Sequence, residues 1–197
     1  MAVDLEGFSK LGVLDQRMAQ TRLGQVLERA ATGAGLSRAG WYRQPRGDGE
    51  LAILPGDTDV ALVVAQFPHL LEQALRELRS DSVRHPRLRL RVAMHYEPLS
   101  AGEFGPVGSA PIVACRLLDA RATKAALAAD PAHDLVLVIS EKLYDEVVTT
   151  RFHGLEPRRF RRMRATIKGV TYRGYLCLGT PKWVMAARED LAHPALQ

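Results

Sequence analysis

Two aspartates stand at positions that suit a divalent cation. Asp48 lies in the sequence RGDG at residues 46–49, between two runs of strand-forming residues, and a Gly-Asp-Gly so placed is a strong signal for a β-hairpin. Asp4 follows a short apolar run and precedes a loop that begins at Leu5. If the first strand lies beside the hairpin, both carboxylates face one point. Because Mg²⁺ prefers a few carboxylates with water and phosphate oxygens, this pattern predicts a metal-nucleotide site.

The elements that must position these aspartates follow from hydrophobic periodicity. The order is β-α-β-β-α-β and then α-β-α-β-β, which predicts an α+β fold with a ferredoxin-like βαββαβ core and a mainly antiparallel sheet flanked by helices. That core has its helices on one face and pairs the first strand with the hairpin. Only three residues precede Asp4, so the first strand is short or continues from upstream residues. We expect these elements to form one domain over residues 1–180, with residues 181–197 as a C-terminal tail.

The expected elements have these bounds. Helices are predicted at 14–31, at 59–78 with a kink or break near Gln66 caused by Pro68, and at 109–120, 123–129 and 141–148, the third of these capped by Ser109. Strands are predicted at 40–44, 50–54, 88–96, 135–140, 161–168 and 172–178, and a loop at 98–107.

Composition narrows the class of protein. The chain has 197 residues, of which 47% are hydrophobic, so it can bury a full core and fits one domain. Its two cysteines favour a reducing compartment over a disulfide framework, and no apolar run is long enough to span a bilayer. We therefore expect a cytoplasmic protein without a membrane partner.

The net charge of +5 is modest, so a nucleic-acid partner is not expected from charge alone. Much of the excess lies in the arginine run at residues 158–164. This run usually marks a solvated edge strand, and nucleic-acid binding through it is the alternative that it leaves open.

Several segments together carry a family resemblance. DLEGFS at residues 4–9 and RGDG at 46–49 resemble the two metal motifs of class III nucleotidyl cyclases. RVAMHYE at 91–97 is similar to the family's Arg-x-Gly-x-His-x-Gly strand, and GSAPIVACR at 108–116 to its Gly-x-x-Val-Asn-x-Ala-x-Arg helix start. The likeness covers nearly the whole chain, and the order and spacing of the motifs carry it.

The resemblance implies a head-to-tail homodimer that converts a nucleoside triphosphate (NTP) to a 3′,5′-cyclic monophosphate and pyrophosphate with Mg²⁺ or Mn²⁺. The triphosphate would bind the metals of one subunit, and the partner would supply the base-reading and transition-state residues. The implied roles are metal ligands for Asp4 and Asp48, a transition-state arginine for Arg116, a triphosphate contact for Lys168, and substrate contacts for Gly7, Phe8 and Gln44.

Three positions depart from the family pattern. Gln44 stands where ATP-using members place a base-reading lysine, and Gly105 stands at the second base-reading position, with Glu103 within a short loop shift. Ile112 replaces the asparagine that orients the ribose, and it cannot make a hydrogen bond. These changes leave the base open and permit a pyrimidine, as in cyclases that resemble those of bacterial antiphage signalling. They also define the main alternative, a catalytically degenerate cyclase-like domain that serves as a nucleotide-binding or regulatory dimerisation module.

Other chemistry-bearing residues have structural explanations. His95 closes an alternating strand and fits a structural role, and Cys115 fits a small core residue because no histidine pairs with it in a known pattern. Arg116 fits a solvated helix arginine as well as a catalytic one. Trp41 and Tyr42 would lie near the cleft of a cyclase, although aromatic strand residues usually belong to the core or an interface.

Overall fold

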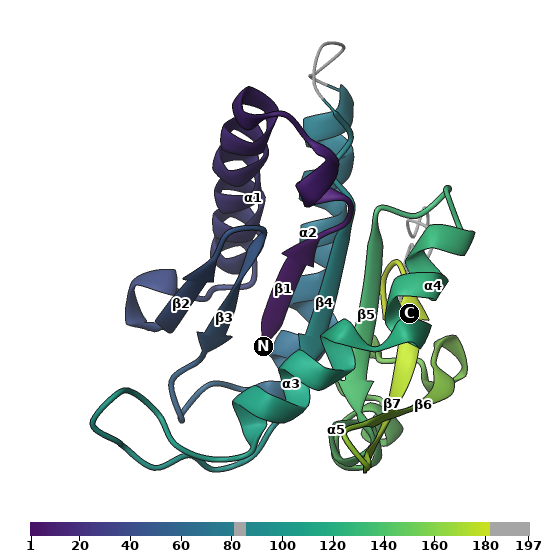
Figure 1. The fold of residues 1–197 in the computed structure, drawn as a ribbon. Helices are drawn as coiled ribbons and strands as arrows, with labels where there is room; N and C mark the ends of the chain where they lie inside the picture. The colour runs from purple at the N-terminus through teal and green to yellow at the C-terminus, as the bar shows by residue number, and fades with distance from the viewer. Residues whose placement is uncertain (81–85, 182–197) are drawn as a thin grey trace, which may run out of the picture.

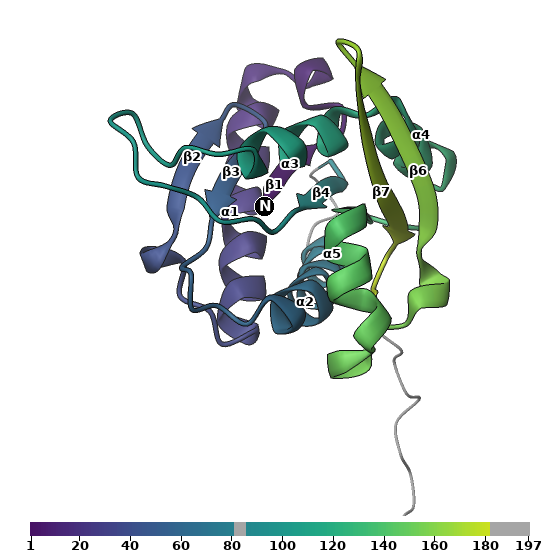
Figure 2. The ribbon, with the colours of Figure 1, turned by 90° about the horizontal axis from the view of Figure 1, so that it is seen from below.

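The computed structural model describes residues 1–80 and 86–181 and contains a single mixed sheet with helices on both faces (Figures 1 and 2). The strands are β1 (Ala2–Leu5), β2 (Tyr42–Arg46), β3 (Gly49–Ile53), β4 (Leu90–Met94), β5 (Leu135–Ser140), β6 (Arg161–Ile167) and β7 (Val170–Leu178). The α-helices are α1 (Val13–Gly33), α2 (Val60–Ser80), α3 (Ala110–Asp119), α4 (Arg121–Ala129) and α5 (Glu141–Glu146).

The sheet has the order β2-β3-β1-β4-β5-β7-β6, and every neighbouring pair is antiparallel except the parallel pair β4 and β5. Its first four strands have the ferredoxin-like order, with β1 between β3 and β4. The predicted α+β class, the βαββαβ core and the mainly antiparallel sheet are confirmed.

Two hydrophobic cores follow from the alternation of strand side chains. One face of the sheet packs against α1, α2 and α5, and Val3, Leu27 and Phe67 are fully buried there. The other face packs against α3, where Ala2, Ala93 and Leu117 form a smaller core. Figure 2 shows α3 and the α1–α2 pair on opposite sides of the sheet. The expectation of helices on one face therefore holds for the first six elements only, because α3 covers the second face.

Two local predictions were wrong in detail. Helix α2 continues through Pro68, so the predicted break near Gln66 is wrong, while the kink stays a prediction. The apolar stripe of the helix, with Phe67 and Leu71 fully buried, holds it against the sheet. Ser109 precedes α3 but makes no side-chain cap, because its hydroxyl donates to Glu97 instead. The predicted tail lies, apart from Pro181, outside the described residues.

The remaining bounds agree with the predictions to within a few residues, and β5 agrees at both ends. Strand β6 lies at an edge of the sheet, as the arginine run indicated. No helix in residues 1–80 or 86–181 is long and apolar enough to cross a membrane.

Candidate functional site

The sheet brings Asp4 and Asp48 together at one end. Strand β1 pairs with β3 so that Asp4 lies opposite Gly49, and the Leu5 amide donates to the Asp48 carbonyl at 2.8 Å. A Cβ at position 49 would lie 1.9 Å from the Val3 carbonyl oxygen, so only glycine permits this approach. The hairpin glycine thus has a positional reason that goes beyond turn formation: it lets β1 lie directly beside the turn that carries Asp48.

An arginine partners the first aspartate. Arg91 lies opposite Asp4 in the β1–β4 register, and its guanidinium donates to both carboxylate oxygens, Nε to Oδ1 at 2.7 Å and Nη2 to Oδ2 at 2.9 Å. Both side chains are only 12% exposed. The sequence analysis assigned Arg91 no role. The signal that would have found it is register, since the predicted β4 lies next to β1 and Arg91 faces the same side as Asp4.

Burial and neighbouring charges act together on the carboxyl group of Asp4. Burial raises the pKa of the Asp4 carboxyl, the Arg91 guanidinium opposes that rise, and the negative charges of Asp48 and Asp119 add to it. The pKa of Asp4 thus reports three acidic groups within one electrostatic neighbourhood. A bound cation would relieve that repulsion.

The turn after β1 is held from both sides. Gly7 adopts the left-handed conformation (φ 71°), and a one-turn helix (Phe8–Lys10) follows, with Phe8 packed against the larger core. Gln20 of α1 donates its side-chain amide to the Gly47 carbonyl at 2.7 Å. Helix α1 therefore clamps the hairpin turn beside the β1 turn, so that Gly7 and Phe8 lie near the two aspartates.

The donor set fits a hard divalent cation. In the part of the chain that the structure describes, no three His, Cys, Asp or Glu residues are grouped to hold a metal by themselves. Asp4 of β1 and Asp48 of the adjoining β2–β3 turn offer carboxylate oxygens, and Mg²⁺ completes such a partial set of ligands with water and phosphate oxygens. These two residues would hold such an ion, and the remaining ligands would come from a nucleotide.

The structure separates Lys168 from the aspartates. Strand pairing sets Asp4 level with Arg91, Val136 and Leu178 on successive strands. Lys168 lies in the β6–β7 turn, ten residues before Leu178, so at about 3.3 Å per residue it lies about 30 Å along the sheet from that level. Its side chain is exposed and its φ is 51°. One copy of the chain does not bring Lys168 to Asp4.

Arg116 takes an intermediate position. It is half-buried on α3, which packs across β1, β4 and β5 on the Asp4 side of the sheet. Ile112, one turn earlier on α3, is 54% exposed and is not required by the core. Cys115 lies partly buried against the smaller core, in agreement with a structural role.

The predicted base-reading positions are close to each other. Gln44 is exposed on the edge strand β2 and faces the α3 side, opposite Leu51. Gly105 lies against Tyr42 of the same strand, because a Cβ at position 105 would lie 2.5 Å from the Tyr42 hydroxyl. The loop that carries Glu103 and Gly105 therefore lies alongside β2. Trp41, by contrast, is buried and stacks at a tilt on Phe67 in the core.

A polar cluster joins the ends of β4 and β5. His95 Nδ1 lies 2.7 Å from Ser140 Oγ, and its Nε2 lies 3.5 Å from a Glu97 oxygen, to which Ser109 also donates. Burial lowers the pKa of His95, and the bonds from Ser109 and His95 lower the pKa of Glu97. The cluster fixes the start of α3 and agrees with a structural His95.

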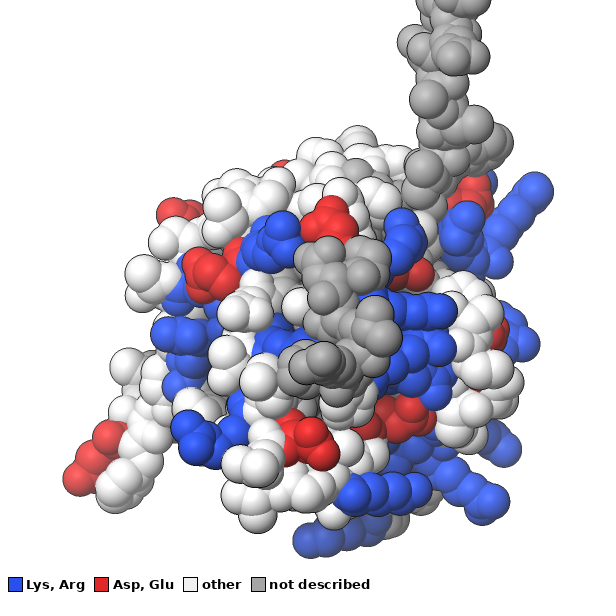
Figure 3. Space-filling view, turned by 90° about the horizontal axis from the view of Figure 1, so that it is seen from above, with Lys and Arg blue, Asp and Glu red and all other residues white. Residues whose placement is uncertain are grey.

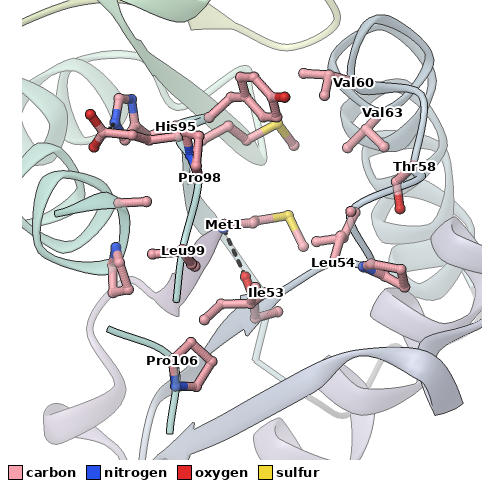
Figure 4. Close-up of a pocket in the computed structure, with 18 of the residues that line it drawn as sticks. Met1, Ile53, Leu54, Thr58, Val60, Val63, His95, Pro98, Leu99 and Pro106 are labelled. Carbon is pink, nitrogen blue, oxygen red and sulfur yellow. Dashed lines mark hydrogen bonds and ion pairs between the residues drawn. The ribbon is translucent and has the colours of Figure 1, made fainter. Parts of the chain in front are cut away.

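A cavity of about 630 Å³ opens beside this cluster, at the end of the sheet away from Asp4 (Figure 4). Its walls are mainly apolar and come from the end of β3, the start of α2 and the chain after β4, including Leu54, Val63 and Pro98. Figure 4 shows Met1, Ile53 and Leu99 close to its centre. The cavity holds none of the predicted catalytic residues.

Basic residues are common at the end of the molecule where β1 finishes. Figure 3 shows Lys and Arg over much of this face, interspersed with Asp and Glu. On the edge strand, Arg162 donates to the Tyr175 hydroxyl and pairs with Glu141 at 3.7 Å, so part of the arginine run is engaged within the fold.

The comparisons with known proteins concern the fold. No family model and no curated protein sequence matches the chain. Among solved structures, the guanylyl cyclase Cya2 is 15% identical with a TM-score of 0.59 over 94% of each chain. An adenylate/guanylate cyclase/hydrolase from Silicibacter pomeroyi is 18% identical, with a TM-score of 0.59 over 90% of this chain and 93% of that one. The guanylate cyclase domain of RhGC from Catenaria anguillulae, in complex with GTP, is 14% identical, with a TM-score of 0.57 over 91% and 94%. The chain therefore has the fold of class III cyclase domains.

Proposed function

We propose that this protein is a divergent bacterial class III nucleotide cyclase that converts an NTP to a 3′,5′-cyclic monophosphate and pyrophosphate. The observation that carries the proposal is the approach of Asp4, at the end of β1, to the β2–β3 turn that carries Asp48, in a sheet with the fold of cyclase domains. The absence of a side chain at Gly49 permits this approach. The acidic pair supplies oxygen ligands for Mg²⁺ or Mn²⁺, and the fold supplies the frame in which such a pair meets a triphosphate.

Different residues of the chain would have different roles in this reaction. A divalent ion, when bound, would withdraw charge from the phosphate oxygens and the leaving pyrophosphate. Asp4 and Asp48 would hold it. Arg116 and Lys168 would place positive charge where negative charge grows at the α-phosphate and the leaving group. The turn at Gly7 and Phe8 would lie beneath the triphosphate.

The site would be shared between two copies of the chain. Lys168 lies about 30 Å along the sheet from the level of Asp4, so a site that uses both takes them from different subunits. A head-to-tail dimer with two-fold symmetry would produce two such sites. In this arrangement Gln44 and the loop at Gly105, which lie close to each other, would read the base of a nucleotide that is bound to the aspartates of the partner subunit.

The base would be read by an unusual set. Gln44 presents an amide that both donates and accepts hydrogen bonds, and Glu103 lies on the neighbouring loop. Neither matches the pair expected for adenine, and we propose a pyrimidine nucleotide as the substrate. Ile112 supplies no hydrogen bond to the ribose, so turnover should be slow.

The experiment is direct. The purified protein is incubated separately with ATP, GTP, CTP and UTP, first with Mn²⁺ and then with Mg²⁺, and the products are separated by chromatography. Asp48→Asn should abolish product formation. Asp57→Asn, which changes an exposed aspartate just after β3, is the matched control and should leave it intact. If folded, dimeric protein gave no cyclic product from any nucleotide, the proposal would fail and a catalytically inactive, nucleotide-binding role would replace it.

A further inference from the structure

The contact between Arg91 and Asp4 has a consequence for metal binding. The guanidinium uses both carboxylate oxygens of Asp4 in a fork-to-fork pair, at 2.7 and 2.9 Å. A divalent ion at Asp4 would bind one or both of those same oxygens. Since the pair is 88% buried on each side, water does little to screen the arginine charge from an arriving cation.

Arg91 offsets the negative charge that surrounds Asp4. Asp4 lies beside the turn that carries Asp48, whose backbone carbonyl accepts from the Leu5 amide at 2.8 Å, and the negative charge of Asp119 also acts on it. Without a positive group, three acidic residues would repel one another in a largely buried region. Arg91 offsets that repulsion when no metal is bound. A metal ion would do the same with twice the charge, so the two cations compete for one place.

We propose that Arg91 is an internal counter-ion that holds Asp4 until a divalent cation displaces it, and that it thereby sets the metal affinity of the site. The inference rests on the proposed metal role of Asp4. Arg91 is then a positioning residue that lowers metal affinity, because each metal-binding event includes release of the guanidinium from the Asp4 carboxylate.

The first test measures Mn²⁺ binding by EPR without nucleotide, so that it does not depend on turnover. Arg91→Gln removes the charge but keeps hydrogen-bond donors of similar reach. It should tighten Mn²⁺ binding about tenfold or more, because a like charge at contact distance is lost. Arg91→Lys keeps the charge and should bind close to wild type. Arg164→Gln is the matched control, since it removes one exposed arginine on the distant edge strand and should leave the affinity unchanged.

A second measurement follows Arg91 in the wild-type protein. The Nε–H signal of Arg91 in the NMR spectrum of the wild-type protein, assigned by its loss in Arg91→Lys, should shift and exchange faster with water as Mg²⁺ is added. A signal that stays unchanged at saturating Mg²⁺ would overturn the proposed release.

The outcomes separate this inference from the proposed function. If Asp4→Asn or Asp48→Asn leaves Mn²⁺ binding unchanged, the metal site itself is wrong. If those changes abolish binding but Arg91→Gln leaves it unchanged or weakens it, the metal site stands and the role of Arg91 is overturned.

Discussion

The two ends of the sheet differ in how firmly they hold their functional residues. At one end, Asp4 is buried, paired with Arg91, and set against a turn that α1 clamps through Gln20. At the other, Lys168 lies exposed at the tip of the β6–β7 hairpin. In the first region strand pairing fixes the positions of the acidic side chains, and Arg91 offsets part of their negative charge. The second carries the positive charge of Lys168, about 30 Å along the sheet from the level of Asp4.

Under the proposed dimer, one chain would hold two halves of a site rather than one whole site. The buried half would contain Asp4 and Asp48, and the half called exposed would contain Lys168 together with Arg116 and Ile112 of α3. The geometry of the buried half is fixed within each subunit, because the register between β1, β3 and β4 sets the positions of its residues. The exposed half can adapt to a partner, since a hairpin tip has few contacts within its own chain. The predictions below test the two halves separately, starting from the largest expected effect.

Arg116→Ala should remove the transition-state charge of the exposed half. We expect the kcat for cyclic nucleotide formation to fall by roughly 100-fold to 1,000-fold, with a smaller change in KM, because the charge it stabilises develops only during reaction. Steady-state kinetics on the best nucleotide give the result. Arg121→Ala, an exposed arginine at the start of α4, is the control and should be nearly silent. Equal losses in both variants would show that Arg116 acts only through surface charge.

Gly49→Ala should damage the buried half. Its Cβ would meet the Val3 carbonyl at 1.9 Å and the Asp4 Cα at 2.8 Å, and backbone cannot yield easily. We expect a loss of about 3 kcal/mol in the free energy of unfolding, measured by urea titration. Gly47→Ala has open space around its Cβ and should change stability far less. A stable Gly49→Ala protein would mean that β1 and β3 are not this close.

Ile112→Asn should sharpen the exposed half. Ile112 is 54% exposed, so its replacement costs little stability, and an asparagine there could donate to the ribose. A new hydrogen bond at the substrate should raise kcat about tenfold. Ile112→Leu keeps the apolar character and should not. If kcat with asparagine equals that of the wild type, this side chain does not face the substrate.

A variant of His95 tests the polar cluster that joins the ends of β4 and β5. Burial lowers the pKa of its imidazole in the folded protein, with Glu97 opposing and Lys142 adding to the effect. The unfolded chain therefore binds the proton more readily, so the stability contribution is full above pH of about 6.5 and is lost as the pH falls through the folded pKa.

The wild type should thus lose more stability between pH 7.5 and 5.5 than His95→Asn, as judged from urea midpoints at both values. Identical losses in the two proteins would contradict a buried, neutral His95.

Local patterns were enough to predict the frame of the site. The Gly-Asp-Gly turn and the apolar run before Asp4 predicted the hairpin and its neighbour, because glycine and alternation act within a few residues. The continuous apolar run of β5 predicted a central strand covered on both faces, and it is fully buried.

Tertiary contacts decided what the sequence left open. The Arg91–Asp4 pair depends on the register between β1 and β4, and the two residues are 87 positions apart in the sequence. The Ser109 hydroxyl donates to Glu97 and does not cap α3. Pro68 did not end α2, because burial of the helix outweighed one missing hydrogen bond. Local propensity therefore failed where a distant side chain offered a better partner.

The most direct test of a shared site mixes two inactive proteins. Asp48→Asn lacks the buried half and Arg116→Ala lacks the exposed half. If each site takes its halves from different subunits, a mixed dimer has one intact site and one doubly damaged site. Equal mixing then gives mixed dimers in half of the population, and we predict recovery of about a quarter of the wild-type cyclase activity. Activity no greater than the sum of the two separate variants, with subunit exchange confirmed, would contradict the shared site.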